Sequence, residues 1–246
     1  MWREGLPGLP PVALRGACVL SAKAFALLQD LQMIIAVDGP AASGKGTLAS
    51  GLARHYALPH LDTGLLYRAV GRAVEAYEGK DEFEARAIAA AENLDKADIE
   101  PEFLLSAKIG NLASKVAVIG PVRKALFDYQ RAFATQANGA VLDGRDIGTV
   151  ICPDADVKLF IQADSKARME RRARQLESRG QVVDRYALYH QIEERDARDM
   201  GNPNGGFYKA ADAHLLDTTL LDIAAALRAA IAIVDRTMAL KAGQQP

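Results

Sequence analysis

The chain has 246 residues, and 50% of them are apolar, which is enough to bury the core of one α/β domain with an appendage. A formal net charge of −1 excludes the strong basic field that gathers nucleic acid, and no apolar run reaches the roughly 18 residues of a membrane span. The 2 cysteines and 4 histidines have no metal-ligand or disulfide spacing, which is typical of a reducing cytoplasm. We therefore expect a cytoplasmic protein with no nucleic-acid partner and no membrane partner.

Residues 1–32 differ from the rest of the chain, because they mix Gly and Pro with a weakly amphipathic stretch after Ser21. A secretory signal is the functional alternative, but Arg15 and Lys23 interrupt its apolar run and no clear cleavage site precedes Met33. We expect a disordered extension, or one that results from an upstream choice of start codon, before the first core strand.

From Met33 onward, short apolar segments alternate with amphipathic ones, which predicts a parallel sheet with helices on both faces. The expected strands are 34–38, 59–62, 140–143, 157–161 and 214–217. The expected helices are 44–56, 64–77, two within 111–137 that are broken at Gly120-Pro121, 164–179, 184–199 and 220–240. Residues 79–110 are charged and alanine-rich and are expected to be an insertion of helix and irregular chain, 200–209 a loop, and 241–246 a flexible tail.

The segment after the first expected strand reads GPAASGKGT and has the G-x-x-x-x-G-K spacing of a phosphate-binding loop. Backbone N–H groups in such a loop converge on phosphate oxygens, and Gly39 and Gly44 let the backbone turn and approach closely. Lys45 can bridge the β- and γ-phosphates, and Thr47, displaced one position by Gly46, can offer a hydroxyl to Mg²⁺. A glycine-rich turn that binds nothing is the alternative, which the strand–loop–helix context disfavours.

The segment DTGLLYR follows the second expected strand and puts a hydroxyl and a cation near a strand-to-helix turn. Thr63, Tyr67 and Arg68 can together hold a phosphate and a sugar. The alternative is a helix-capping Thr63 and a solvated Arg68, and this segment alone does not decide between the two.

The segment LDGRD brings charges to the carboxyl end of a buried strand, where open α/β sheets bind ligands. Arg145 offers a bidentate fork to a phosphate, and Asp146 can accept a bond from an exocyclic amine. Asp143 can orient magnesium-bound water. A structural ion pair within this turn is the alternative interpretation.

Arginines are concentrated between residues 168 and 198. Such runs are usually solvated helix faces, and the interleaved acids agree with that alternative and disfavour a nucleic-acid-binding helix. Phosphoryl transfer nevertheless needs fixed cations, and helical spacing puts several of these side chains on a common side. The groups that share a side are Arg168, Arg171 and Arg172; Arg195, Arg198 and Asp199; and, on an earlier helix, Arg123, Gln130 and Arg131.

Together these motifs resemble the bacterial cytidylate kinases of the nucleoside monophosphate kinase family over most of residues 33–240. The glycine loop is shared by the wider kinase family, whereas DGRDIGTV together with VRKAL…QR is similar to the cytidylate kinases in particular. The resemblance implies an α/β fold with a P-loop NTPase-type parallel sheet flanked by helices. It also implies an acceptor-binding part at about 63–137, with a shortened insert, and a mobile helical lid at about 168–210.

The resemblance further implies a role for each matching residue. The ATP phosphates would lie on Gly39, Pro40, Ala41, Ala42, Ser43, Gly44, Lys45, Gly46 and Thr47. The acceptor would be held at its phosphate by Thr63, Arg68 and Arg145, at its base by Ser114, Arg123 and Asp146, and at its sugar by Tyr67, Arg195 and Asp199. Mg²⁺ would be held by Thr47 and, through water, by Asp143. The catalytic cations would be Lys45, Arg145, Arg171, Arg195 and Arg198, with Arg172 at the border of the lid.

The activity that the resemblance implies is ATP- and Mg²⁺-dependent phosphorylation of CMP and dCMP by a monomer whose partners are small nucleotides. Two alternatives stay open: a kinase for another small acceptor, such as UMP, AMP or a metabolite alcohol, and an ATP-binding switch without turnover. Two departures from the family's pattern are visible. The β-rich insert of the family is cut down to residues 79–110, and Asn202 stands near the position where the family tends to place an arginine, so we expect weakened transfer.

Overall fold

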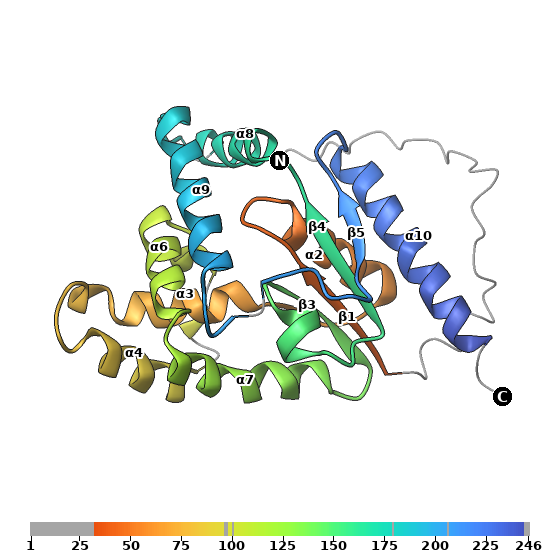
Figure 1. Cartoon of the computed structure of the whole chain (residues 1–246), viewed down its shortest axis with the longest axis horizontal. Helices are drawn as coiled ribbons and strands as arrows, with labels where there is room; N and C mark the ends of the chain where they lie inside the picture. The colour runs from red at the N-terminus through yellow and green to blue at the C-terminus, as the bar shows by residue number, and fades with distance from the viewer. Residues whose placement is uncertain (1–31, 96–97, 100, 179, 206, 244–246) are drawn as a thin grey trace, which may run out of the picture.

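The computed structural model describes residues 32–95, 98–99, 101–178, 180–205 and 207–243. A parallel five-stranded sheet with the order β2-β3-β1-β4-β5 forms the centre of this part of the chain (Figure 1). The strands are β1 (Met33–Asp38), β2 (His60–Asp62), β3 (Gly139–Gly144), β4 (Val157–Gln162) and β5 (His214–Asp217). The predicted α/β class and the five predicted strands are confirmed, and the expected extension at 1–32 falls almost wholly outside the described residues.

Helices cover both faces of the sheet and extend to one side of it (Figure 1). They are α2 (Lys45–Tyr56), α3 (Thr63–Ala73), η1 (Glu75–Tyr77), α4 (Phe83–Glu92), α5 (Pro101–Leu104), α6 (Ala107–Val116), α7 (Gly120–Ala134), the π-helical turn η3 (Ile147–Ile151), α8 (Ser165–Glu177), α9 (Arg185–Met200) and α10 (Ile223–Ala242). Since parallel strands meet with their carboxyl ends at one edge, the loops after β1, β2 and β3 lie side by side, with Asp38 opposite Gly144 and Asp62 opposite Asp143.

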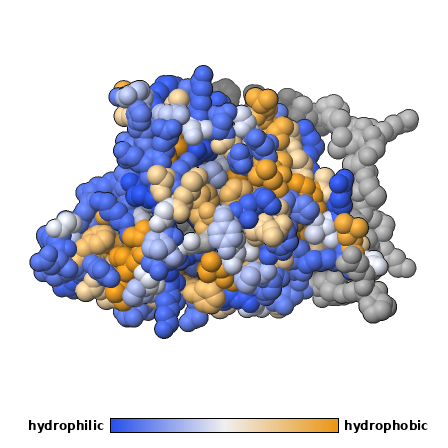
Figure 2. All heavy atoms as spheres, viewed as in Figure 1, coloured by the Kyte–Doolittle hydropathy of each residue, from blue (hydrophilic) through white to orange (hydrophobic). Residues whose placement is uncertain are grey.

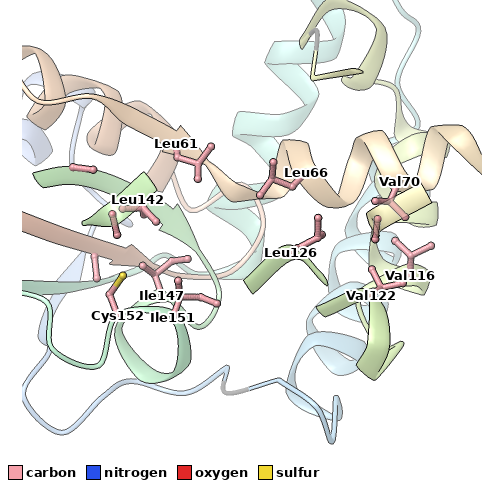
Figure 3. Close-up of a cluster of buried hydrophobic side chains, with 14 of the residues drawn as sticks. Leu61, Leu66, Val70, Val116, Val122, Leu126, Leu142, Ile147, Ile151 and Cys152 are labelled. Atoms are coloured by element: carbon pink, nitrogen blue, oxygen red, sulfur yellow. The ribbon is translucent and has the colours of Figure 1, made fainter. Parts of the chain in front are cut away.

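The core lies in two layers because successive side chains of a strand point to opposite faces. On β1, Ile34 and Ala36 join a cluster with α3, α6 and α7, part of which is shown in Figure 3. Ile35 and Val37 point the other way and join a cluster with α2 and α10. All six residues of β1 are buried, as expected for a central strand covered on both faces.

The helical part beside the sheet differs in detail from the sequence-based expectation. The helix predicted over 64–77 ends at Ala73 as α3, because Val74 leaves helical dihedrals at φ −106° and ψ 9° while its side chain stays buried. The insertion predicted at 79–110 contains α4, α5 and the start of α6. Ala87 and Leu104 are fully buried there, so the described part of this segment is packed into the cores.

The arm formed by α8 and α9 has its own small apolar cluster, which contains Met169, Leu176 and Ile192. Asp164 and Asp184 cap the two helices by accepting bonds from backbone N–H groups of the first turns. The two predicted helices are therefore confirmed to within a residue or two at each end. Figure 2 shows hydrophilic side chains over this arm and apolar ones near β5 and the start of α10, where Leu215, Leu220 and Ile223 are exposed.

The last helix is longer than predicted at its carboxyl end, because α10 continues to Ala242. Lys241 was expected in a flexible tail, but its ammonium group lies 3.1 Å from a carboxylate oxygen of Asp156. Residues 244–246 of that tail lie outside the described residues. Within the described ranges, no helix has the length and apolar character needed to cross a bilayer.

Candidate active site

The loop Gly39–Thr47, called the P-loop below, adopts a conformation that depends on its glycines. Gly39 and Gly44 adopt φ values of +156° and +92°, and a Cβ on Gly39 would come within 2.2 Å of the Ile161 carbonyl oxygen. Among the described residues, α2 has no side-chain N-cap, and the buried hydroxyl of Ser43 has no hydrogen-bond partner. A helix that starts with unsatisfied N–H groups above a buried unpaired hydroxyl is a cradle for an anion.

Arginines of α8 support the P-loop from outside. Arg171 donates to the carbonyl oxygen of Ser43 at 3.1 Å and to the hydroxyl of Thr218 at 3.0 Å. Arg168 donates to the carbonyl oxygen of Ala41 at 3.2 Å and pairs with Asp196 at 2.6 Å. These two side chains are therefore not a solvated helix face, because their guanidinium groups bind the backbone of the loop.

Two cavities flank the P-loop. The first cavity, of about 320 Å³, lies between the P-loop, α3, α6 and α9. The second cavity, of about 670 Å³, lies between the P-loop, α8 and the start of α10. They share the lining residues Ala42, Lys45, Gly46, Arg172 and Gln175, so they meet at Lys45.

Most of the residues singled out by sequence line these cavities. The first cavity brings together the predicted residues Ala41, Ala42, Lys45, Gly46, Thr63, Tyr67, Arg68, Ser114, Arg123, Asp143, Arg145, Asp146, Arg172, Arg195 and Asp199. The second brings together Ala42, Ser43, Gly44, Lys45, Gly46, Thr47, Arg171 and Arg172. Gly39 and Pro40 are buried and line neither. Arg198 also lines neither, and its Nε donates to the Ser114 hydroxyl at 3.4 Å.

The charged residues of the β3 loop pair with other elements. Asp146 forms an ion pair with Arg123 of α7, and Arg145 Nε lies 2.7 Å from a carboxylate oxygen of Asp199 on α9. An ion pair confined to the turn, the alternative considered above, is therefore excluded. One oxygen of Asp143 lies 2.8 Å from Nε2 of His60.

Cations outnumber carboxylates around the first cavity, six to four. Burial, followed by the nearby Arg145, lowers the pKa of Lys45 to about 8. Burial and then Arg145 also lower the pKa of Arg195 to about 10, and Arg195 Nε is buried without a hydrogen-bond partner in the described part of the chain. Crowded, desolvated cations of this kind are stabilised when a polyanion enters.

The acceptor-side hydroxyls and cations are fixed by the backbone. Thr63 donates to the carbonyl oxygen of Asp143 at 2.8 Å, and Arg68 donates to that of Leu104 at 2.7 Å. Gly144 permits the first contact, because a Cβ there would lie 2.6 Å from the Thr63 hydroxyl. Tyr67 lies beside Arg123, whose guanidinium carbon is 6.0 Å from the ring centre.

The donor set around the P-loop fits a magnesium ion that is bound chiefly through a ligand. Within the ranges described above, no three His, Cys, Asp or Glu side chains group together as a metal site. Asp143 reaches the P-loop, since one of its oxygens lies 3.6 Å from where a Cβ on Gly46 would be, next to Thr47. One hydroxyl and one carboxylate beside a phosphate cradle suit Mg²⁺, which keeps several waters and substrate phosphates as ligands.

Sequence reasoning also grouped residues that the structure separates. Arg131 was placed on one face with Arg123, but it pairs with Asp154 at 2.7 Å and donates to the Ile151 carbonyl oxygen. Gln130 is buried and donates to the carbonyl oxygen of Leu126. Neither residue lines either cavity.

Other site residues were missed. Asp62 lines the first cavity and caps α3 by accepting from Gly64 N at 2.9 Å, and burial followed by Asp143 raises its pKa. Thr218, for which the sequence predicts no role, supports the P-loop, whereas Asn202, noted above for the missing arginine, lines the first cavity and donates to the Ala117 carbonyl oxygen at 3.1 Å. The position of Asp62 directly before Thr63-Gly64 could have identified it as a helix cap. The contacts of Asn202 and Thr218 could not be found in this way, because they join segments that are far apart in the sequence.

A parallel sheet, a glycine-rich loop after its central strand and a cationic cavity beside that loop define a phosphotransferase of the P-loop kinase class. The family model of cytidylate kinase matches residues 35–236. The chain therefore belongs to the cytidylate kinase family, as the sequence motifs indicated.

Two relatives illustrate the similarity. The cytidylate kinase of Xanthobacter autotrophicus is 55% identical over 203 residues, which cover 82% of this chain and 97% of the relative. The cytidylate kinase of Afipia carboxidovorans is 50% identical over 209 residues, which cover 85% of this chain and 100% of the relative. A solved gluconokinase from Sinorhizobium meliloti 1021 is a much weaker match, with 14% identity and a TM-score of 0.46 over 88% of this chain and 99% of that one.

Proposed function

We propose that this chain transfers the γ-phosphoryl group of ATP to CMP, and also to dCMP, giving CDP or dCDP and ADP. The observation that carries the proposal is the pair of cavities that meet at Lys45, one lined by the P-loop and the other by side chains that suit a pyrimidine monophosphate. Two nucleotides bound end to end would bring their phosphates together at this junction.

In this proposal ATP occupies the second cavity. Its phosphates bind the N–H groups of the P-loop and Lys45, and its base lies toward Leu221 and Ile223, near the start of α10. Thr47 and, through a water molecule, Asp143 would hold Mg²⁺ beside these phosphates, and the ion would supply positive charge that offsets the charge of the transferring group.

CMP occupies the first cavity in the same proposal. Its phosphate binds Thr63, Arg68 and Arg145, and its sugar lies near Tyr67, Arg195 and Asp199. Ser114, Arg123 and Asp146 meet the base. Because Asp146 and Arg123 pair with each other, they offer an acceptor and a donor side by side, which matches the exocyclic amine of cytosine and the adjacent ring nitrogen N3. Uracil has a carbonyl where cytosine has the amine, and it would meet Asp146 unfavourably.

The reaction needs no strong base, since the acceptor phosphate is already an anion. A phosphate oxygen of CMP attacks the γ-phosphorus, the bond from that phosphorus to the bridging β,γ-oxygen breaks, and ADP leaves with the bond's electrons. Lys45, Arg145 and Arg195 stabilise the charge as it moves between the phosphates. Closure of the α8–α9 arm over the acceptor would exclude water and prevent ATP hydrolysis.

The proposal includes a monomer that works in the cytoplasm on small nucleotides. A coupled assay of ADP release across CMP, dCMP, UMP and AMP tests the substrate. We expect CMP and dCMP to give the highest kcat/KM. A preference for another acceptor, or ATP binding without acceptor-dependent ADP release, would contradict the proposal and favour one of the two alternatives named above.

A further inference from the structure

Asp38 is a buried acid to which the proposed reaction gives no role. It is the last residue of β1, directly before the P-loop, and is 5% exposed. Its two carboxylate oxygens accept hydrogen bonds from Ile147 N and Gly148 N, each at 2.8 Å. Asp38 therefore joins the start of the P-loop to the segment that follows Arg145 and Asp146.

The segment that Asp38 holds is the first turn of η3. The first N–H groups of any helical turn lack partners within the turn, and an Asp at the N-cap usually satisfies them. Asp146 is the N-cap residue here, but its side chain makes no capping bond and instead pairs with Arg123 at the first cavity. Asp38 caps the turn in its place, which allows the Asp146 carboxylate to face the cavity.

The contact between Asp38 and the turn requires that Gly148 approach closely and that the Asp38 carboxyl group be buried. A Cβ on Gly148 would lie 3.1 Å from Cδ of Lys158, which is a tight contact, and 3.4 Å from an Asp38 oxygen, so the turn packs closely against both side chains. Burial raises the pKa of Asp38 to about 7, against the opposing effect of the two N–H bonds. An acid that is costly to bury is typical of a functional constraint rather than of core packing.

We propose that Asp38 is a positioning residue that caps η3 and thereby holds Asp146 and Arg145 toward the acceptor. Its place at the end of β1 fixes their position relative to the P-loop. The inference rests on the proposed function, because the acceptor whose recognition it supports is CMP.

The test is Asp38→Asn, which keeps the shape of the side chain. The amide can still accept from one of the two backbone N–H groups, but its NH₂ group faces the other N–H group, which loses its acceptor. A charge-assisted bond is lost, so we expect KM for CMP to rise about tenfold or more and KM for ATP to change less than about twofold. We also expect the ratio of kcat/KM for CMP over UMP to fall, and exchange of the Ile147 and Gly148 amide hydrogens to accelerate.

A matched control is Asp156→Asn. Asp156 accepts a bond from Ile34 N at 3.0 Å, at the opposite end of the same strand. We expect it to leave KM for CMP and the CMP/UMP ratio unchanged. Equal changes in the two Asp→Asn variants would overturn the inference, since they would report only loosening of β1.

Gly148→Ala crowds the same turn, since its Cβ would lie 3.1 Å from Cδ of Lys158 and 3.4 Å from an Asp38 oxygen, and it is the second variant if Asp38→Asn fails to fold. We expect the same selective rise in KM for CMP. An unchanged KM for CMP in a folded variant of either kind, or equal rises in KM for CMP and ATP, contradicts the positioning role. Absence of CMP-dependent ADP release by the unaltered protein contradicts the proposed function instead, so the two failures are distinguishable.

Discussion

The two cavities that meet at Lys45 differ in the groups that line them. The second cavity is formed around the backbone of the consecutive P-loop residues, which Arg171 and Thr218 hold in place while also lining the cavity. The first is shaped by side chains from α3, α6, α7, α9 and the β3 loop, which the pairs Arg123–Asp146 and Arg145–Asp199 hold in place. We therefore expect substitutions in the P-loop to lower the rate with every acceptor alike. Substitutions in the paired side chains should instead change which acceptor is preferred.

Lys45→Ala should have the largest effect, because it removes the cation at the junction of the two cavities. We expect kcat to fall on the order of a thousandfold or more with every acceptor, since fixed cations of this kind contribute that much to phosphoryl transfer. Folding should survive, because Lys45 lines the two cavities and its ammonium group, whose pKa burial lowers, is costly to keep charged there. Lys166→Ala, an exposed change on α8, is the control and should leave kcat unaltered. Undiminished kcat in Lys45→Ala would remove this residue from the mechanism.

Asp146→Ala should act on selectivity. We expect the ratio of kcat/KM for CMP over UMP to fall about tenfold to a hundredfold, with little change in ATP binding. The free energy of unfolding should fall by about 3 kcal/mol, because Arg123 is left buried and unpaired.

The same helix supplies the control for that change. Arg131 also pairs with an aspartate, but Asp154 is 57% exposed and neither residue lines the first or the second cavity. Asp154→Ala should change unfolding by less than about 1 kcal/mol and leave selectivity intact. An unaltered CMP/UMP ratio in Asp146→Ala, measured by steady-state kinetics, would reject its role in base recognition.

The contrast between the cavities also explains what the sequence could predict. The P-loop is contiguous, so its spacing and its strand–loop–helix context were enough to predict it. The strands were predicted to within one residue at each end, because buried parallel strands are short apolar runs.

Contacts between distant segments could not be predicted in the same way. Helical spacing put Arg123 and Arg131 on a common side, but it did not reveal that one faces Asp146 and the other Asp154. The π-helical turn at Ile147–Ile151 is capped from a distance, since the N–H groups of Ile147 and Gly148 bind Asp38, which lies more than 100 residues earlier in the chain (109 residues before Ile147). Only the fold brings these groups together.

The pH dependence of kcat/KM for ATP should follow the titration of the Lys45 ammonium group. Its lowered pKa, about 8, means that the protonated form that binds phosphate is lost above that pH. We expect kcat/KM for ATP to be level below pH 8 and to fall about tenfold per pH unit above it. The folded state binds this proton less tightly than the unfolded chain, so the contribution of Lys45 to stability should rise from pH 8 toward the ordinary pKa of 10.5. A level kcat/KM up to pH 9.5 would contradict the shifted pKa.

Asn202→Arg should have the smallest effect. Asn202 lines the first cavity, so an arginine there could add a cation near the transferring group. We expect kcat to rise several-fold, in line with the weakened transfer predicted from the missing arginine. Asn204→Ala controls for loosening of the same loop, because Asn204 donates to the Val118 carbonyl oxygen at 2.9 Å without lining the cavity. An unchanged or lower kcat in Asn202→Arg would show that the missing arginine does not limit the rate.

The central claim is that ATP and CMP bind end to end across Lys45. Calorimetry with an inhibitor that joins cytidine and adenosine through a chain of phosphates tests this most directly. The account predicts a Kd well below those of ATP and CMP alone and competition with both nucleotides, because the second half binds at a high effective concentration. An inhibitor that binds no more tightly than ATP, and leaves CMP binding unchanged, would contradict it.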